Sequence, residues 1–120
     1  MPKFGSRSES NLADVCSELV EICRFVIQTY DFTVLCGHRG EAAQNAAYPK
    51  YTKVRWPNSK YNQLPSLAID IIPYDPIRHS IVPWDATEEF AMLAGHMLMA
   101  AFAFGYTIRW GHDWNHNNVL

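Results

Sequence analysis

The segment Ser66–Tyr74, SLAIDIIPY, can fold in few ways because it is a short run of strand-forming residues interrupted by one carboxylate, Asp70. Side chains alternate between the two faces of a strand, so Asp70 shares a face with apolar neighbours. An unpaired buried charge is strongly unfavourable. We therefore expect Asp70 to have a partner, which is a nearby arginine (Arg39 or Arg109), a metal ion or a set of hydrogen-bond donors.

The segments on either side of this strand alternate between helical and extended patterns. Apolar residues recur at helical spacing from Ser10 to Tyr30, and β-branched residues fill Asp31–Gly37. An alanine-rich stretch, Gly40–Tyr48, predicts a short helix, and Lys50–Pro65 is irregular. Loops of this length inside a compact domain are usually functional or mobile.

The last part of the chain predicts a long helix followed by a strand. Phe90–Phe104 is apolar nearly all round, which is typical of a buried central helix, and Gly105 is suited to end it. Tyr106–Gly111 then reads as a third strand. The whole order predicts the α+β class, with a small sheet covered by helices in a single domain.

Composition excludes several classes of protein. Of the 120 residues 48% are hydrophobic, and the net charge is −2 with acids and bases interspersed, so electrostatics give no reason to expect a nucleic-acid partner. There is no apolar run of about 20 residues to span a membrane, and the first residues lack a secretory pattern. The three cysteines are expected to be free thiols.

Two further groups of residues could bind a ligand. His38 and Arg39 follow the end of a predicted strand, where a guanidinium can bind a carboxylate or polarise a carbonyl; an ordinary surface arginine is the alternative. His112 and His116 have the spacing of helical metal ligands, but the surrounding sequence favours a loop with solvated histidines.

Several motifs together resemble one family. They are Gly37-His38-Arg39, Ser59-Lys60-x-Asn62, Pro65-Ser66-x-Ala68-x-Asp70 and Arg109-Trp110-Gly111-x-Asp113-Trp114. In this combination, from Phe4 to about Asn115, the chain resembles the phage branch of the zinc D-Ala-D-Ala carboxypeptidase and L-alanyl-D-glutamate endopeptidase family. The resemblance implies a small antiparallel sheet packed by helices, and an endolysin-type function on the stem peptides of bacterial peptidoglycan.

The resemblance also implies roles for individual residues. Family members hold one zinc ion with His, Asp and His, and a nearby acid is the general base. Asp70 matches the aspartate ligand, and Arg39 matches the arginine that steadies the substrate carbonyl. Ser59 matches the serine that opens the histidine motif, and His38 is a further candidate for substrate binding.

The chain departs from the family pattern at two places. Tyr61 stands where the first histidine ligand is expected, and the acidic loop with a base and a histidine that ends the family pattern has no counterpart. Structural and catalytic zinc sites need three or four protein ligands, so both departures argue against zinc hydrolysis. We expect residues 1–120 to form one peptidase-like domain that lacks the family's C-terminal segment.

These departures leave several interpretations open. The chain is a degenerate homologue, or further residues supply the missing ligands, or His38, His112 or His116 substitutes for them. Zinc is the expected cofactor if the protein is active, and the alternative is a non-catalytic binding or virion module on the same fold. The absence of a signal sequence predicts synthesis in the host cytoplasm and action at the cell wall or in a virion.

Overall fold

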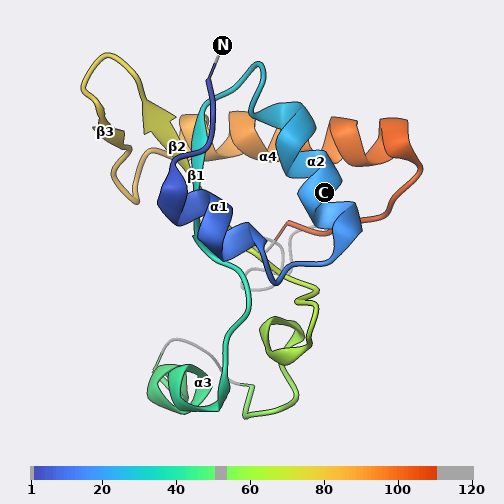
Figure 1. Ribbon diagram of the computed structural model, residues 1–120. Helices are drawn as coiled ribbons and strands as arrows, with labels where there is room; N and C mark the ends of the chain where they lie inside the picture. Colours follow the sequence, from blue (N-terminus) through green and yellow to red (C-terminus); the bar gives the residue numbers. More distant parts are fainter. Residues whose placement is uncertain (1, 51–53, 111–120) are drawn as a thin grey trace.

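The computed structural model describes residues 2–50 and 54–110 (Figure 1). Its helices and strands are, in chain order, α1 (Ser6–Leu12), α2 (Ser17–Val26), β1 (Phe32–Cys36), α3 (Glu41–Ala47), the 3-10 turn η1 (Lys60–Asn62), β2 (Asp70–Asp75), β3 (Ser80–Ile81) and α4 (Thr87–Phe104). The three strands form an antiparallel sheet in the order β1-β2-β3. The α+β class is therefore confirmed.

The register of β1 on β2 fixes where Asp70 lies. Phe32 pairs with Pro73 and Val34 with Ile71, and the register shifts before Cys36 pairs with Asp70. Asp70 is thus the first residue of its strand, at the end where β1 also finishes. An irregularity of this kind re-aims side chains and is common beside functional sites.

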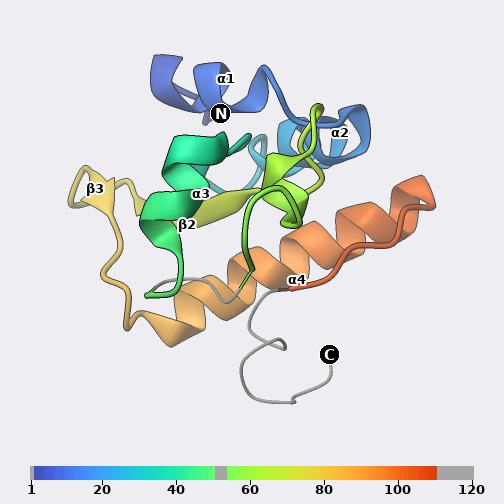
Figure 2. The same cartoon turned by 90° about the horizontal axis from the view of Figure 1, so that it is seen from below.

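Helices cover the sheet from two sides. Figure 2 shows α1 and α4 on opposite sides of the strands, and α2 packs against α4. Apolar side chains of these helices and of β1 form the core: Leu12, Val15, Ile22, Cys23, Val26, Ile27, Phe32, Val34, Leu93, Met97, Ala100 and Ala101. Burial of this surface is the main force that holds the small sheet together.

The free edge of β1 is closed by two side chains of α1. Ser8 Oγ accepts a hydrogen bond from the Val34 N–H at 3.0 Å, and Asn11 Nδ2 donates to the Val34 carbonyl at 2.7 Å. Unpaired backbone groups at a strand edge would otherwise invite other chains to pair with them. This explains why Ser8, a polar residue, is buried.

The prediction of one helix over Ser10–Tyr30 is wrong, because the chain leaves the helix after Leu12 and begins α2 at Ser17. Around Val15 it runs extended and pairs with Ser66: the Ser66 N–H donates to the Asp14 carbonyl at 2.7 Å, and the Cys16 N–H donates to the Ser66 carbonyl at 2.9 Å. The helical pattern of the sequence continues through Val15. The contact with Ser66, about fifty positions away in the chain, overrides it.

The third strand is also not where the sequence placed it. Residues 106–110 form no strand, and β3 comes instead from the connection after β2. The carboxylate of Asp75 accepts hydrogen bonds from the N–H groups of Ile77 and Arg78, and His79 adopts a positive φ of 56°. Side-chain capping of this kind makes the tight reversal that brings β3 beside β2.

Helix α4 is not the buried central helix that its composition predicts. Leu93 and Met97 face the core, but Met92, Met99 and Phe102 are exposed, Phe102 to 82%. A three-stranded sheet and α2 cover only one side of an 18-residue helix. Its predicted end is confirmed, since Gly105 adopts φ 80°. Within residues 2–50 and 54–110, none of the helices has the length and hydropathy needed to cross a bilayer.

Candidate functional site

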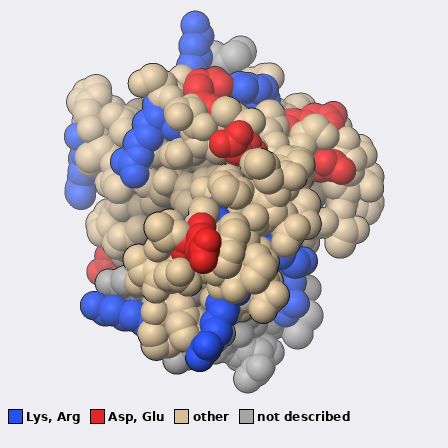
Figure 3. All heavy atoms as spheres, turned by 60° about the horizontal axis from the view of Figure 1, so that its bottom comes forward, with Lys and Arg blue, Asp and Glu red and all other residues tan. Residues whose placement is uncertain are grey.

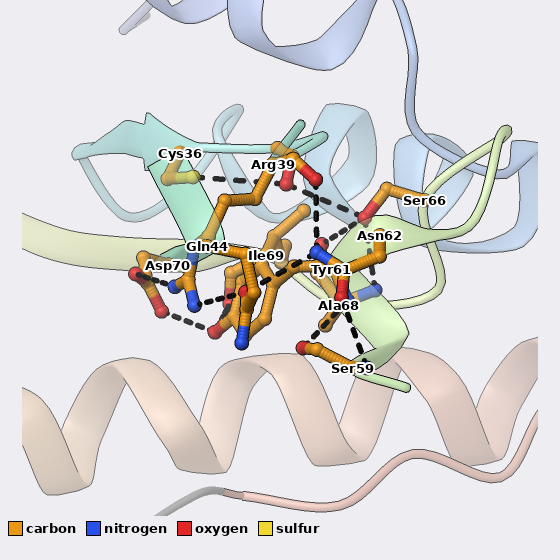
Figure 4. Close-up of polar contacts among 11 residues, drawn as sticks. Cys36, Arg39, Gln44, Ser59, Tyr61, Asn62, Ser66, Ala68, Ile69 and Asp70 are labelled. Carbon is orange, nitrogen blue, oxygen red and sulfur yellow. Dashed lines mark hydrogen bonds and ion pairs between the residues drawn. The ribbon is translucent and has the colours of Figure 1, made fainter. Parts of the chain in front are cut away.

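Five segments meet at the end of the sheet where β1 stops and β2 begins. Figure 1 shows α3 and η1 beyond that end of the strands, away from the helices that cover the core. The polar side chains that gather there come from β1, the loop after it, α3, η1 and β2 (Figure 4). The irregular segment that precedes β2 in the sequence therefore supplies Ser59, Tyr61 and Asn62 to the site.

Asp70 has two partners, one for each carboxylate oxygen. The Tyr61 hydroxyl donates a short hydrogen bond to Oδ1, and a guanidinium nitrogen of Arg39 lies 4.0 Å from Oδ2 (Figure 4). The Asp70 side chain remains 46% exposed, whereas that of Arg39 is only 17% exposed. The predicted pairing with Arg39 is therefore present, while Arg109 is exposed on the surface.

Tyr61 is fixed at its backbone as well as at its hydroxyl. Its N–H donates to Ser59 Oγ at 3.2 Å, and its carbonyl accepts from the Arg39 N–H at 2.7 Å. Burial, and next the negative charge of Asp70, raise the pKa of the Tyr61 phenol above its ordinary value. Tyr61 is therefore a neutral hydrogen-bond donor at physiological pH.

Arg39 is held in one orientation by its neighbours. Its guanidinium lies 4.3 Å from the centre of the Tyr61 ring, and Nη1 donates to Gln44 Oε1 at 2.9 Å. Gln44 is completely buried and donates in turn to the Val54 carbonyl at 2.6 Å. Asn62 Nδ2 donates to both Gln44 Oε1 and the Arg39 carbonyl, at 3.2 and 2.9 Å. The guanidinium is thus pre-oriented toward Asp70.

Ser59 and Ser66 both organise the backbone of the site. Ser59 is 8% exposed and begins η1, where its side chain and that of Asn62 form a reciprocal capping box. Ser66 is completely buried, and its hydroxyl donates to the Ala68 carbonyl at 2.8 Å and lies 3.3 Å from the Gly37 carbonyl. The substrate-binding role that the resemblance gives Ser59 stays a prediction.

The remaining predicted ligands are not part of this cluster as far as the structure describes it. His38 is half-buried in the loop between β1 and α3. His112, His116 and Asp113 lie outside the described residues. Cys36 is Asp70's cross-strand partner, and burial raises the pKa of its thiol. The described cysteines are free, as predicted.

The described side chains do not fit a zinc ion. In residues 2–50 and 54–110, no three His, Cys, Asp or Glu side chains are grouped so that they could hold a metal. Asp70 is the single carboxylate of the cluster, Tyr61 is a neutral phenol, and the Arg39 guanidinium lies beside the carboxylate where a second cation would be repelled. One carboxylate is far from the three or four ligands of zinc sites.

The surface around the site carries mixed charge. On the face seen in Figure 3, acidic and basic side chains are scattered among neutral ones and do not gather into a patch of one sign. A groove of about 680 Å³ lies at the opposite end of β2, around Asp75 and Arg78, and none of the residues predicted for the site lines it.

Comparison with known proteins identifies the family. The family model described as phage L-alanyl-D-glutamate peptidase matches residues 1–120. The chain belongs to this family. It is 33% identical over 117 residues to the L-alanyl-D-glutamate peptidase of Escherichia phage T5, across 94% of this chain and 82% of that protein. The phage peptidase resemblance inferred from the motifs is thus confirmed.

The fold has a counterpart among solved structures. It is similar to the Serratia marcescens L-Ala D-Glu endopeptidase ChiX, with a TM-score of 0.77 and 23% sequence identity, across 95% of this chain and 83% of that one. This likeness supports the peptidase fold.

Gln44 and Asn62 are the site residues whose roles the sequence did not reveal. Gln44 lies in an alanine-rich helix that shows no functional pattern, and its importance comes from contacts with segments five to eighteen residues away. Asn62 carried a weak signal, since Ser59-x-x-Asn62 has the spacing of a capping box. Both residues position Arg39 without standing beside Asp70 themselves.

Proposed function

We propose that this protein is an endolysin-type domain that engages the stem peptides of bacterial peptidoglycan at the Arg39–Asp70 site. Family membership supports the substrate class. The observation that carries the proposal is the convergence of Arg39, Tyr61 and Asp70 from three separate segments at one end of the sheet. A guanidinium fixed in this way is suited to a peptide carboxylate or carbonyl.

Hydrolysis by zinc needs ligands beyond those that the described residues provide. In such a site Asp70 would hold the metal, and the other ligands would come from elsewhere in the protein. We propose recognition of the peptide as the function of the described site, with Arg39 as the principal contact. The L-Ala–D-Glu link is the bond that a completed site would cut.

The test is binding to insoluble peptidoglycan, measured by co-sedimentation with and without its stem peptides. We expect the protein to sediment with intact peptidoglycan and to remain in solution with glycan strands from which an amidase has removed the peptides. Replacing Arg39→Ala should weaken binding about 10- to 100-fold, because a hydrogen bond to a charged group contributes about 1.5–3 kcal/mol.

Two variants separate a specific contact from general effects. Arg78→Ala makes the same change at a side chain that is 79% exposed on the β2–β3 hairpin, and it should leave binding unchanged. Arg39→Lys keeps the charge but loses the planar fork, so it should restore only part of the affinity. Equal binding by wild type and Arg39→Ala, with both folded by circular dichroism, would exclude the proposed site.

Release of new amino groups from the same peptidoglycan reports hydrolysis independently. Binding without release of amino groups would show recognition alone, and binding with release would show hydrolysis. Rapid release of free L-alanine carboxyl and D-glutamate amino ends would show that ligands outside the described residues complete the site.

A further inference from the structure

The Asp70 carboxylate is already neutralised by groups of this chain. Its Oδ1 accepts from the Tyr61 hydroxyl, and its Oδ2 lies 4.0 Å from the Arg39 guanidinium. A metal ion bound to Oδ1 would compete with the hydroxyl, and one bound to Oδ2 would sit beside the positive charge of Arg39. Both effects oppose binding of a dication.

The displacing movement is also restricted. Tyr61 is tied to Ser59 through its N–H and to Arg39 through its carbonyl, and the Arg39 side chain stacks on its ring at 4.3 Å. Figure 4 shows the Arg39 and Tyr61 side chains packed together beside the Asp70 carboxylate. Rotating the phenol away would therefore break the cation–π contact as well as the hydrogen bond to the carboxylate.

We propose that Tyr61 and Arg39 take the charge-balancing place of a metal ion at Asp70, and that the site binds its peptide ligand without a divalent cation. Tyr61 is the residue that excludes the metal. The statement about the peptide rests on the proposed function above; the statement about the metal does not.

The first test is metal uptake by the full chain after dialysis against a chelator. Calorimetric titration with zinc, and with cobalt as a spectroscopic probe, should detect no stoichiometric site in the wild-type protein. Tyr61→His removes the phenol and adds an imidazole beside Asp70, so it should bind cobalt detectably where the wild-type protein does not. Tyr61→Phe removes the hydroxyl that competes for Oδ1 but adds no ligand, so its cobalt binding should stay well below that of Tyr61→His.

One result overturns the proposal directly. That result is a titration in which the wild-type protein binds one equivalent of zinc and the Asp70→Asn variant binds none. Should Tyr61→His fail to fold, the wild-type and Asp70→Asn titrations still decide the matter.

The second test is sedimentation with peptidoglycan in the presence and absence of the chelator. Binding should be unchanged when the chelator is added, and loss of binding that zinc restores would contradict a metal-independent site. If the wild-type protein does not sediment under either condition, the proposed function fails, while the metal titration still answers whether Tyr61 excludes the ion.

Discussion

Gly37 is a position where adding a single methyl group should strongly lower the stability of the fold. It is buried at the end of β1, just before His38 and Arg39. A Cβ added there would overlap the backbone carbonyl oxygen of Asn11 and would lie 2.7 Å from Val15 Cγ2. Real Cβ atoms do not approach so closely, so Gly37→Ala must push α1 away from β1.

The cost follows from how firmly α1 is attached. Overpacking a well-filled site costs about 1–3 kcal/mol, and the upper end applies here because the obstructing atom is backbone and the Asn11 side chain is bonded to Val34. A loss of about 3 kcal/mol would lower the melting temperature of a domain this size by about 12 °C. The free energy of unfolding of a small domain is about 5–15 kcal/mol in total, so this loss would be a large part of it.

The control is the same substitution elsewhere. Gly95 lies inside α4 with nothing within 4 Å of its added Cβ, and it has ordinary helical backbone angles. Gly95→Ala should therefore stabilise the protein by about 0.5–1 kcal/mol. Urea titration followed by far-ultraviolet circular dichroism measures both variants. A free energy of unfolding for Gly37→Ala within about 0.5 kcal/mol of wild type would refute the described contact between α1 and β1.

Four other predictions test separate parts of the molecule. Gln44→Leu should cost about 2–4 kcal/mol in urea titration, because it removes the buried amide that bonds Arg39, Asn62 and the Val54 carbonyl; a neutral result would contradict the buried network. Burial raises the pKa of the Cys23 thiol to about 12, so a disulfide reagent at about pH 8 should modify Cys23 only on unfolding. Phe102→Ser should change stability by less than about 0.5 kcal/mol, since that ring is 82% exposed. Glu9→Gln should cost less than about 1 kcal/mol at neutral pH, because the Glu9–Arg24 pair is about half exposed.

The sign of the Glu9 contribution follows from its environment. The hydrogen bond from Arg24 lowers the pKa of Glu9 below its ordinary value of 4.5. A carboxyl group with a lowered pKa stabilises the fold above its unfolded pKa and loses that contribution as the pH falls through the folded one. The difference between wild type and Glu9→Gln should therefore be present at neutral pH and disappear in acid, and a difference that grows below pH 4.5 would be inconsistent with the ion pair.

The sequence by itself determined the fold class, the family and the need of Asp70 for a partner. Helical and alternating patterns are local, so they identified β1, the core of β2 and the end of α4 at Gly105. The cost of an unpaired charge in an apolar strand predicted that Asp70 would have a partner but left Arg39, Arg109, a metal ion and hydrogen-bond donors open. The structure shows Tyr61 and Arg39 in that place. These inferences need only the properties of neighbouring residues and the cost of an unpaired charge.

Only the tertiary structure shows where contacts between distant residues override the secondary structure that the local sequence pattern predicts. Pairing with Ser66 keeps Val15 extended although the sequence around it has a helical pattern. The buried amide of Gln44 orients the Arg39 side chain from another segment. Helix α4 leaves Phe102 in solvent because the sheet is too small to surround it. Each outcome depends on hydrogen bonds and burial between residues far apart in the chain, and periodicity along the sequence carries no information about them.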